Sequence, residues 1–412
     1  MGIANAVPMP LVGSTLAIWL TEYGFGKDEI GLFALMGLPF SLKLLWYPFI
    51  TRVSLPFFAK SPRKGWLLFS FLGMSLSLFC MSLVEPAEKP IFLAILLVFL
   101  YLFVSCLYMV GIAYELESLK EECYRKGSAT FLMGYRVGLL SAGGIALYIA
   151  YLFEWSWVFA FLSLLLFIGS IFIFFQREPF KSHAILKEKR EELLQYNSLM
   201  QSFWHEIILK PCKAFLQRKD WLVIIFVITT FNIGDNMAKV MEGPFCMSLG
   251  FNKADLATAT NMWGFCMAIC GAFVAGFFFK KTDLLRSTVA LGAIHAFTLM
   301  SYYVLTIVGK SFFFLYMTAA LDHFTAGMAM TIITCFLWRI CDKRYIIVQY
   351  ALFWSLYTFK ADIFACAGGF LAAFLPWNLF FSLTACFSVL AALLMWKFVR
   401  NSSSLVVVTS HS

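Results

Sequence analysis

The residues of this sequence that could do chemistry are ionisable side chains that interrupt long apolar runs. They are Lys43, Glu115, Arg136, Asp235, Lys239, Asp322, His323, Lys360 and Asp362. Hydrophobic residues make up 61% of the 412 positions and charged residues only 13%. A soluble protein of this composition would aggregate, so lipid is expected to surround the apolar runs. An ionisable group at membrane depth persists where it faces a partner or a water-filled cavity, so the pattern predicts a polar path through a membrane protein.

Asp322 and His323 are the best candidates for proton coupling, because histidine titrates nearest neutral pH and an adjacent aspartate widens the range. Glu115 near the end of a span is a further candidate. It could pair with Arg136, since burial favours the neutral form of a carboxylate and a nearby cation favours its ionised form. A static salt bridge between Glu115 and Arg136 is the alternative.

Four residues are candidates for substrate binding, and Arg136 and Lys43 are the two in the first half of the chain. Arginine keeps its charge at any relevant pH and offers a planar fork to carboxylate or phosphate. Arg136 could instead form an internal ion pair that locks helix packing. Lys43 lies two turns from Arg52, so it either faces the polar path or extends its ammonium to the membrane interface.

Asp235 and Lys360 are the substrate-binding candidates in the second half. Asp235 follows Gly234 in a stretch whose Asn and Gly predict a loosened helix that frees backbone groups for a ligand. Lys239 lies four residues further on, so the two charges could also neutralise each other along one face. Lys360 and Asp362 point to different faces, and Lys360 is the better candidate.

Other kinds of site have little support. The aromatic residues are mostly lipid-facing or interfacial types, although Trp19, Tyr135, Trp263 and Trp354 are candidates for stacking on sugar rings. The eleven cysteines form no CxxC pair, and no phosphate-binding loop, nucleophile elbow or metal motif occurs. We therefore expect no enzyme activity, no cofactor, no metal and no nucleic-acid partner.

About twelve apolar stretches are long enough to cross a membrane, which takes roughly 20 residues each. They lie near 1–21, 30–50, 65–84, 91–117, 128–152, 156–176, 221–241, 256–279, 287–307, 311–338, 349–374 and 379–398. Basic residues concentrate in alternate loops, which by the positive-inside rule places both termini in the cytoplasm. The first span starts at Met1 with no basic flank and no cleavable signal, so it is either short or clipped.

One long polar stretch divides the chain into two halves of six spans. The expected domains are an N-terminal bundle (1–176), a cytoplasmic linker (177–220), a C-terminal bundle (221–398) and a cytoplasmic tail (399–412). The linker either contains a helix that lies on the bilayer surface or only joins the halves.

The two halves resemble each other weakly. Arg136 is followed by Gly143 and Gly144, and Lys360 by Gly368 and Gly369 at a similar distance. Gly134, Gly138, Ala142 and Gly143 form a small-residue face that suits close helix packing. Two repeats of six spans, with substrate between them, are the plan of major-facilitator transporters. The fold class expected is therefore all-α, with about twelve transmembrane helices in two bundles.

Several strings resemble the AmpG-like muropeptide permeases. They are Val7 to Leu16 with Trp19-Leu20-Thr21, Ile30 to Pro39 with Lys43-Leu44-Leu45-Trp46, Arg63-Lys64-Gly65-Trp66, Gly134-Tyr135-Arg136 with Gly143-Gly144, Gly234-Asp235, and Gln349-Tyr350-Ala351-Leu352. The resemblance keeps order and spacing from the first span to the eleventh. It implies a permease of the bacterial inner membrane that imports anhydro-muropeptides for cell-wall recycling by proton symport, and Lys43, Arg136 and Asp235 match its motif positions.

The sequence departs from that family at two places. The middle of the fourth span has no carboxylate before Glu115, and Lys360 stands where the family has arginine. A carrier of another anionic metabolite, such as a nucleotide-linked acyl group, is therefore the alternative. A non-transporting membrane scaffold or sensor is a third hypothesis, and the charges in both halves argue against it.

Overall fold

The computed structural model consists of helices, with no strand among the residues that it describes. These are residues 1–46, 50, 55, 58, 61–118, 124–176, 178–179, 209–278, 284–342 and 346–406. Within them, ten helices are long and apolar enough to cross a membrane. An eleventh is counted if Gly2–Leu11 and Ser14–Glu22, which meet at a bend of 40°, form one span.

Eleven of the twelve stretches predicted from hydropathy coincide with these helices. The first corresponds to the bent pair. The others correspond to Pro62–Ser82, Pro90–Glu115, Met133–Leu152, Trp155–Phe175, Trp221–Ser248, Lys253–Phe277, Ser287–Val308, Phe312–Ile340, Val348–Phe374 and Trp377–Lys397.

The twelfth stretch, predicted near 30–50, does not form one long helix in its described part. It is divided into α4 (Lys27–Ala34), the 3₁₀ turn η1 (Leu35–Gly37), α5 (Leu38–Ser41) and the 3₁₀ turn η2 (Lys43–Leu45). Pro39 stands at the start of α5, where its missing N–H breaks the ladder of the preceding helix. Residues 47–49 lie outside the described part.

The helices group into two compact units. Unit 1 contains Met1–Phe25 and Met36–Ile207, and unit 2 contains Gly26–Leu35 and Ile208–Ser412. Most of the polar segment 177–220 lies outside the described residues, as do residues 407–412 of the tail, so the expected domain boundaries stay a prediction.

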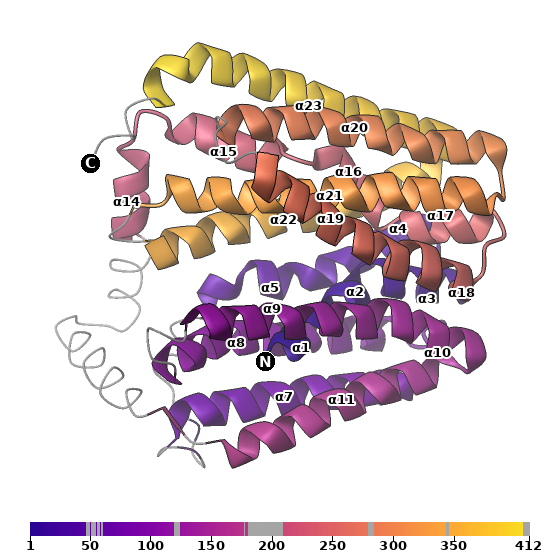
Figure 1. Cartoon of the computed structure of the whole chain (residues 1–412). Coiled ribbons are helices and arrows are strands. Elements are labelled where there is room, and N and C mark those ends of the chain that lie inside the picture. The colour runs from indigo at the N-terminus through magenta and orange to yellow at the C-terminus, as the bar shows by residue number, and fades with distance from the viewer. Residues whose placement is uncertain are drawn as a thin grey trace. The chain divides into compact units, whose positions relative to one another are not determined.

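Unit 1 is a bundle in which α7 packs along both α8 and α11 (Figure 1). Besides α5 and η2, its helices are α1 (Gly2–Ala6), α2 (Pro8–Val12), α3 (Ser14–Glu22), α7 (Pro62–Ser82), α8 (Pro90–Ser118), α9 (Tyr124–Leu140), the π-helical η5 (Ser141–Ile145), α10 (Ala146–Leu152) and α11 (Trp155–Phe175). Trp19 is buried here, with its ring centroid 4.3 Å from that of Phe159. It is therefore part of the core and does not stack on a sugar.

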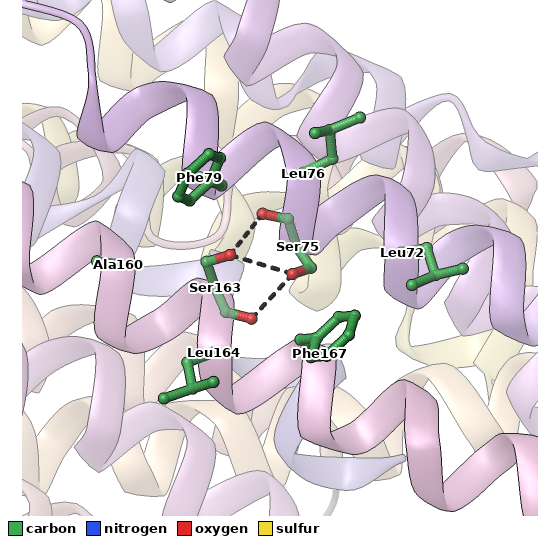
Figure 2. Close-up of a pocket in the computed structure, with 8 residues that line it drawn as sticks. All are labelled: Leu72, Ser75, Leu76, Phe79, Ala160, Ser163, Leu164 and Phe167. Atoms are coloured by element: carbon green, nitrogen blue, oxygen red, sulfur yellow. Dashed lines mark hydrogen bonds between the residues drawn. The ribbon is translucent and has the colours of Figure 1, made fainter.

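Two serines join α7 to α11. The Ser75 hydroxyl donates to the Ser163 carbonyl at 2.9 Å, and the Ser163 hydroxyl donates to the Ser75 carbonyl at 2.8 Å. Around this pair lies a groove of about 580 Å³ walled by Leu72, Leu76, Phe79, Leu164 and Phe167, as Figure 2 shows. Its apolar side chains are those of a lipid-facing surface.

Two residues of the predicted small-residue face of the fifth span, Gly134 and Gly138, make the close helix contact expected of them. A methyl group at Gly138 would overlap the carbonyl of Ile3, and one at Gly134 would lie 3.4 Å from the Ile3 nitrogen. Glycine therefore lets α1 lie directly on α9 beside Arg136.

Unit 2 contains the longer helices, and α20 lies beside α23 while α19 packs along α21 (Figure 1). Besides α4, its helices are α14 (Lys210–Leu216), α15 (Trp221–Thr230), α16 (Ile233–Lys239), α17 (Glu242–Ser248), α18 (Lys253–Leu256), the π-helical η7 (Ala257–Trp263), α19 (Gly264–Phe278), α20 (Leu284–Val308), α21 (Phe312–Ile340), α22 (Ile346–Phe374) and α23 (Trp377–Val406). Its main core gathers side chains such as Phe231, Phe336, Phe353 and Met395.

The two glycines of α22 are contact points between helices. Gly369 lies against Gly31 of α4, and Gly368 lies against the Met237 carbonyl of α16. The ammonium of Lys27 donates to the Ala372 carbonyl at 2.9 Å, which fixes α4 on the same helix.

The span that begins at Trp221 is broken between α15 and α16. Asn232 adopts the left-handed conformation, with φ 59° and ψ 33°, and it is the one non-glycine residue with positive φ in the described chain. Asparagine tolerates this region better than most residues. The break, predicted from Asn232 and Gly234, sets α16 on its own axis and frees backbone carbonyls at the end of α15.

Candidate functional site

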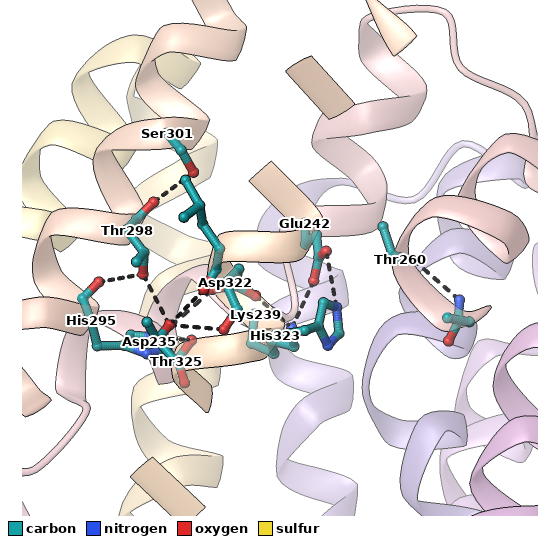
Figure 3. A network of polar contacts seen from close by, with 12 residues as sticks. Asp235, Lys239, Glu242, Thr260, His295, Thr298, Ser301, Asp322, His323 and Thr325 are labelled. Carbon is teal, nitrogen blue, oxygen red and sulfur yellow. Dashed lines mark hydrogen bonds and ion pairs between the residues drawn. The ribbon is translucent and has the colours of Figure 1, made fainter. Parts of the chain in front are cut away.

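A cluster of six ionisable side chains lies in the interior of unit 2. Its members are Asp235, Lys239, Glu242, His295, Asp322 and His323, drawn in Figure 3. Four helices supply them: α16, α17, α20 and α21. We refer to these six residues as the charge cluster.

Lys239 is the cation that holds the cluster together. Its ammonium lies 3.0 Å from Oδ2 of Asp322 and 3.0 Å from Oε2 of Glu242. The Lys239 side chain is 38% exposed, whereas those of Asp322 and Glu242 are 2% and 6% exposed. The lysine therefore connects two buried carboxylates to the accessible side of the cluster.

His295 forms the second contact between helices. Its Nε2 lies 2.9 Å from Oδ1 of Asp235 and 3.7 Å from Oδ1 of Asp322. The imidazole is 1% exposed. A proton on Nε2 would therefore be held between two carboxylates in a site that water barely reaches.

His323 lies on the other side of Asp322. Its Nε2 is 4.0 Å from Oε1 of Glu242, and the side chain is 21% exposed. Its ring lies against Gly264 at the start of α19, where a Cβ would approach it to 2.5 Å. The glycine gives the imidazole room at this position.

Hydroxyl groups support the buried end of the cluster. Thr298 donates to the His295 carbonyl at 2.8 Å, and Thr325 hydrogen-bonds the Asp322 carbonyl at 2.9 Å. The two hydroxyls lie 3.3 Å apart. They tie α20 to α21 at the level of the two charged residues.

The charge of the cluster depends on bound protons. It contains three carboxylates, one ammonium and two imidazoles. With the carboxylates ionised and the imidazoles neutral, two negative charges remain uncompensated inside the unit. Uncompensated charge in such surroundings is costly.

The sequence pattern found four of these residues and missed two. Asp235, Lys239 and Glu242 lie at spacings of four and three, which places them on one side of a helix, but Glu242 falls outside the predicted span 221–241. His295 lies inside the predicted span 287–307 and satisfies the same test as the other intramembrane ionisable residues. That test would have found it.

Two groups within the cluster have donor atoms close enough to bind a metal. They are Asp235, His295 and Asp322, and Glu242, Asp322 and His323, with the donor atoms of each group within 4.8 Å of one another. The Lys239 ammonium already supplies positive charge 3.0 Å from Asp322 and Glu242. This geometry favours an ion-pair network over a metal centre.

Lys360 lies on α22 and is not a member of the charge cluster. Its buried ammonium donates to the carbonyl of Phe231, one of the groups freed where α15 ends, and lies 4.7 Å from the ring centroid of Tyr357. The lysine thus binds the broken end of the neighbouring helix. Asp235 is near enough to act electrostatically on it.

The first-half candidates lie in unit 1. Lys43 is fully buried on η2, and its ammonium is 4.6 Å from the ring centroid of Phe40 and 5.5 Å from that of Tyr108. Two aromatic faces therefore stabilise this cation, which rules out extension to the membrane interface. Arg136 on α9 and Glu115 on α8 are both half-buried, and the amino group of Met1 acts electrostatically on Glu115.

Comparison with known proteins identifies the class. The family model described as Major Facilitator Superfamily matches residues 1–361. The protein named "Putative transporter AmpG 4" of Rickettsia conorii is 28% identical over 391 residues, covering 93% of this chain and 91% of that protein. "Putative transporter AmpG 2" of Rickettsia bellii is 27% identical over 381 residues, covering 92% and 90%.

Solved transporters share the fold at low sequence identity. A mutant of the peptide transporter POT in complex with alafosfalin matches with a TM-score of 0.71 at 9% identity, covering 98% of this chain and 93% of that one. A D-xylose–proton symporter matches with a TM-score of 0.69 at 13% identity, covering 96% and 95%.

These observations define an all-helical, multi-pass membrane transporter for a small molecule, not an enzyme. The chain belongs to the major facilitator superfamily.

Proposed function

We propose that this transporter imports anhydro-muropeptides across the bacterial inner membrane by proton symport, with both termini in the cytoplasm. Two lines of support meet here. Relatives that align with more than nine-tenths of the chain are named AmpG transporters, and the sequence contains the strings that resemble muropeptide permeases. Alternate loops rich in basic residues support the orientation.

The observation that carries the symport proposal is the charge cluster. Asp322 accepts from Lys239 at 3.0 Å through one oxygen and faces His295 at 3.7 Å through the other. In such a network a proton gained by an imidazole or a carboxylate changes which ion pairs are favourable. When the ion pairs that join α16, α20 and α21 change partners, these helices shift relative to one another. Proton binding is thereby coupled to the positions of the helices.

The exposure of the members suggests the order of proton transfer. His323 and Lys239 are the more accessible groups, at 21% and 38%, while His295 and Asp322 are nearly fully buried. We propose that protons enter through His323 and reach Asp322. Asp235, which the sequence places among substrate-binding residues, lies 2.9 Å from His295, so we assign it to the same proton-holding cluster.

The remaining candidates are proposed to attract the anionic cargo. Muropeptides carry carboxylates, and the cations of Lys43, Arg136 and Lys360 offer charge to them. Arg136 is the one whose planar guanidinium suits a carboxylate in two-point contact. Glu115 is proposed to respond to protons in the first half.

Uptake into proteoliposomes tests the proposal. Labelled anhydro-muropeptide should accumulate against its own gradient when the outside is more acidic, and a protonophore should abolish the accumulation. Uptake of a nucleotide-linked acyl anion in place of the muropeptide would establish the alternative cargo. Failure to move either compound would contradict both assignments.

A further inference from the structure

Hydrogen bonds join the ends of two spans at one boundary of unit 2. The span Trp221–Ser248 begins there and the span Phe312–Ile340 ends there. The guanidinium of Arg218 donates through Nη1 to the Ile340 carbonyl at 2.7 Å. The same group binds both oxygens of Asp220 at 2.9 Å, so the charge of Arg218 is used internally to hold the two span ends together.

The short helix α14 is docked on this boundary through one face. The ring centroid of Phe215 lies 4.9 Å from that of Phe353, and the Gln349 amide donates to the Pro211 carbonyl at 3.0 Å. Phe215 and Pro211 are buried. The opposite face of α14 is thereby held outward, and Lys213 lies on it, exposed.

Exposed basic and apolar side chains occur together at this boundary. Lys213, Lys219 and Arg339 are exposed, and within the described part of the chain none of them forms an ion pair. Leu216, Leu222 and Trp338 are 49%, 58% and 60% exposed. We refer to these six residues as the basic rim.

We propose that the basic rim binds the headgroup of an anionic phospholipid, with the phosphate on its cations and the upper acyl chain against its apolar side chains. Charge complementarity selects this partner, because cations at a span end meet the negative lipid surface. The exposed side chains of Trp338, Leu216 and Leu222 are of types that fit the membrane–water interface, where acyl chains lie on one side and water on the other. The inference depends on membrane insertion and not on the cargo.

Quenching of Trp338 fluorescence by brominated lipid tests the proposal on the purified full-length chain. Brominated phosphatidylglycerol and brominated phosphatidylcholine are titrated into detergent-solubilised protein, and the signal of Trp338→Phe is subtracted to isolate Trp338. We expect phosphatidylglycerol to quench at a concentration about tenfold lower than phosphatidylcholine. High salt should reduce the difference between the quenching concentrations of the two lipids, because it screens the attraction between the cations and the headgroup.

Variants of the basic rim test whether its cations cause the preference for phosphatidylglycerol. Lys213→Gln, Lys219→Gln and Arg339→Gln combined should remove the preference, while Lys89→Gln, a lysine-to-glutamine change at an exposed position outside the basic rim, should keep it. Thermal unfolding in phosphatidylcholine should be the same for the triple variant and for Lys89→Gln, which shows that the surface change leaves the fold intact. Equal quenching by the two lipids in the unmodified chain would overturn the proposal. So would a full preference in the triple variant, or competition by inorganic phosphate at equal ionic strength.

Discussion

The ammonium of Lys239 on α16 lies 3.0 Å from Oδ2 of Asp322 on α21, and this pair joins two helices through residues that are 83 positions apart in the chain. Because Lys239 contacts Glu242 at the same distance, it has a second carboxylate if Asp322 becomes neutral. The pair with Asp322 can therefore open without leaving the Lys239 ammonium unpaired, as the proposed proton coupling requires.

Asp322→Asn should leave a folded transporter that exchanges substrate but does not accumulate it. The amide cannot take up a proton, while Lys239 keeps its contact with Glu242, so we expect a loss of about 1–3 kcal/mol in unfolding free energy. Thermal unfolding and paired assays of exchange and uphill uptake measure both effects. Glu88→Gln, a carboxylate-to-amide change at an exposed loop, should alter neither. Unchanged uphill uptake in both Asp322→Asn and His323→Gln would show that the coupling assignment is wrong.

Arg136→Lys should weaken substrate binding by about 1–3 kcal/mol, because it keeps the charge but loses the two-point contact with a carboxylate. Glu115→Gln should then leave binding largely intact. Equilibrium binding and thermal unfolding of each variant separate this role from a structural one. If Arg136 instead pairs with Glu115, removing either charge, by Arg136→Gln or by Glu115→Gln, should strand the other and cost about 3–5 kcal/mol of stability. The double change to glutamine should then restore folding. Normal ligand affinity in a well-folded Arg136→Gln would refute the binding role.

Lys360→Met should destabilise the protein by about 1–3 kcal/mol, because the Phe231 carbonyl at the helix break loses its donor in a buried position. Lys360→Arg keeps a donor and should recover part of the loss.

Asn232→Val should cost about 1–2 kcal/mol, since a β-branched residue fits the left-handed conformation poorly, whereas Asn232→Gly should be tolerated. Thermal unfolding of the four variants measures this order. Equal stability of Asn232→Val and Asn232→Gly would contradict the break.

Cys341, which lies just after the span Phe312–Ile340, should react slowly with thiol reagents. Burial raises the pKa of this thiol to about 12, against the opposing effect of the Arg218 guanidinium. Only the thiolate reacts, and its fraction below the pKa grows tenfold with each pH unit. In a chain whose other cysteines are serine, the rate of alkylation by iodoacetamide should therefore rise about a hundredfold from pH 8 to pH 10, whereas a thiol with the ordinary pKa would level off there. A plateau within that range would show that the pKa is not raised.

Hydropathy was sufficient to predict most of the fold, because a span must bury about 20 apolar residues in lipid whatever its neighbours are. The stretch near 30–50 was the exception. In its described part, Gly37 and Pro39 interrupt the helix, and short turns form at Leu35–Gly37 and Lys43–Leu45. A hydropathy window averages over such breaks.

The pairing of charges was less predictable. Spacing allowed a contact between Asp235 and Lys239 along one face, but the structure pairs Lys239 with Asp322 and Glu242, and Asp235 with His295. The left-handed turn at Asn232 sets the direction of α16, and the packing of α20 and α21 decides which partner each charge meets. Neither is encoded in local spacing, so the candidates could be found in the sequence but their partners could not.

Proton movement driven by substrate is the most direct test of the proposed coupling. Proteoliposomes are suspended in a weakly buffered medium that contains a pH indicator, with the same pH inside and outside. Anhydro-muropeptide is then added to the external medium. We predict that its entry makes the external medium more alkaline, that the change disappears with a protonophore, and that Asp322→Asn still exchanges substrate without any pH change. Substrate entry without alkalinisation in the unmodified protein would contradict proton symport, and alkalinisation that persists in Asp322→Asn would contradict the role of the charge cluster.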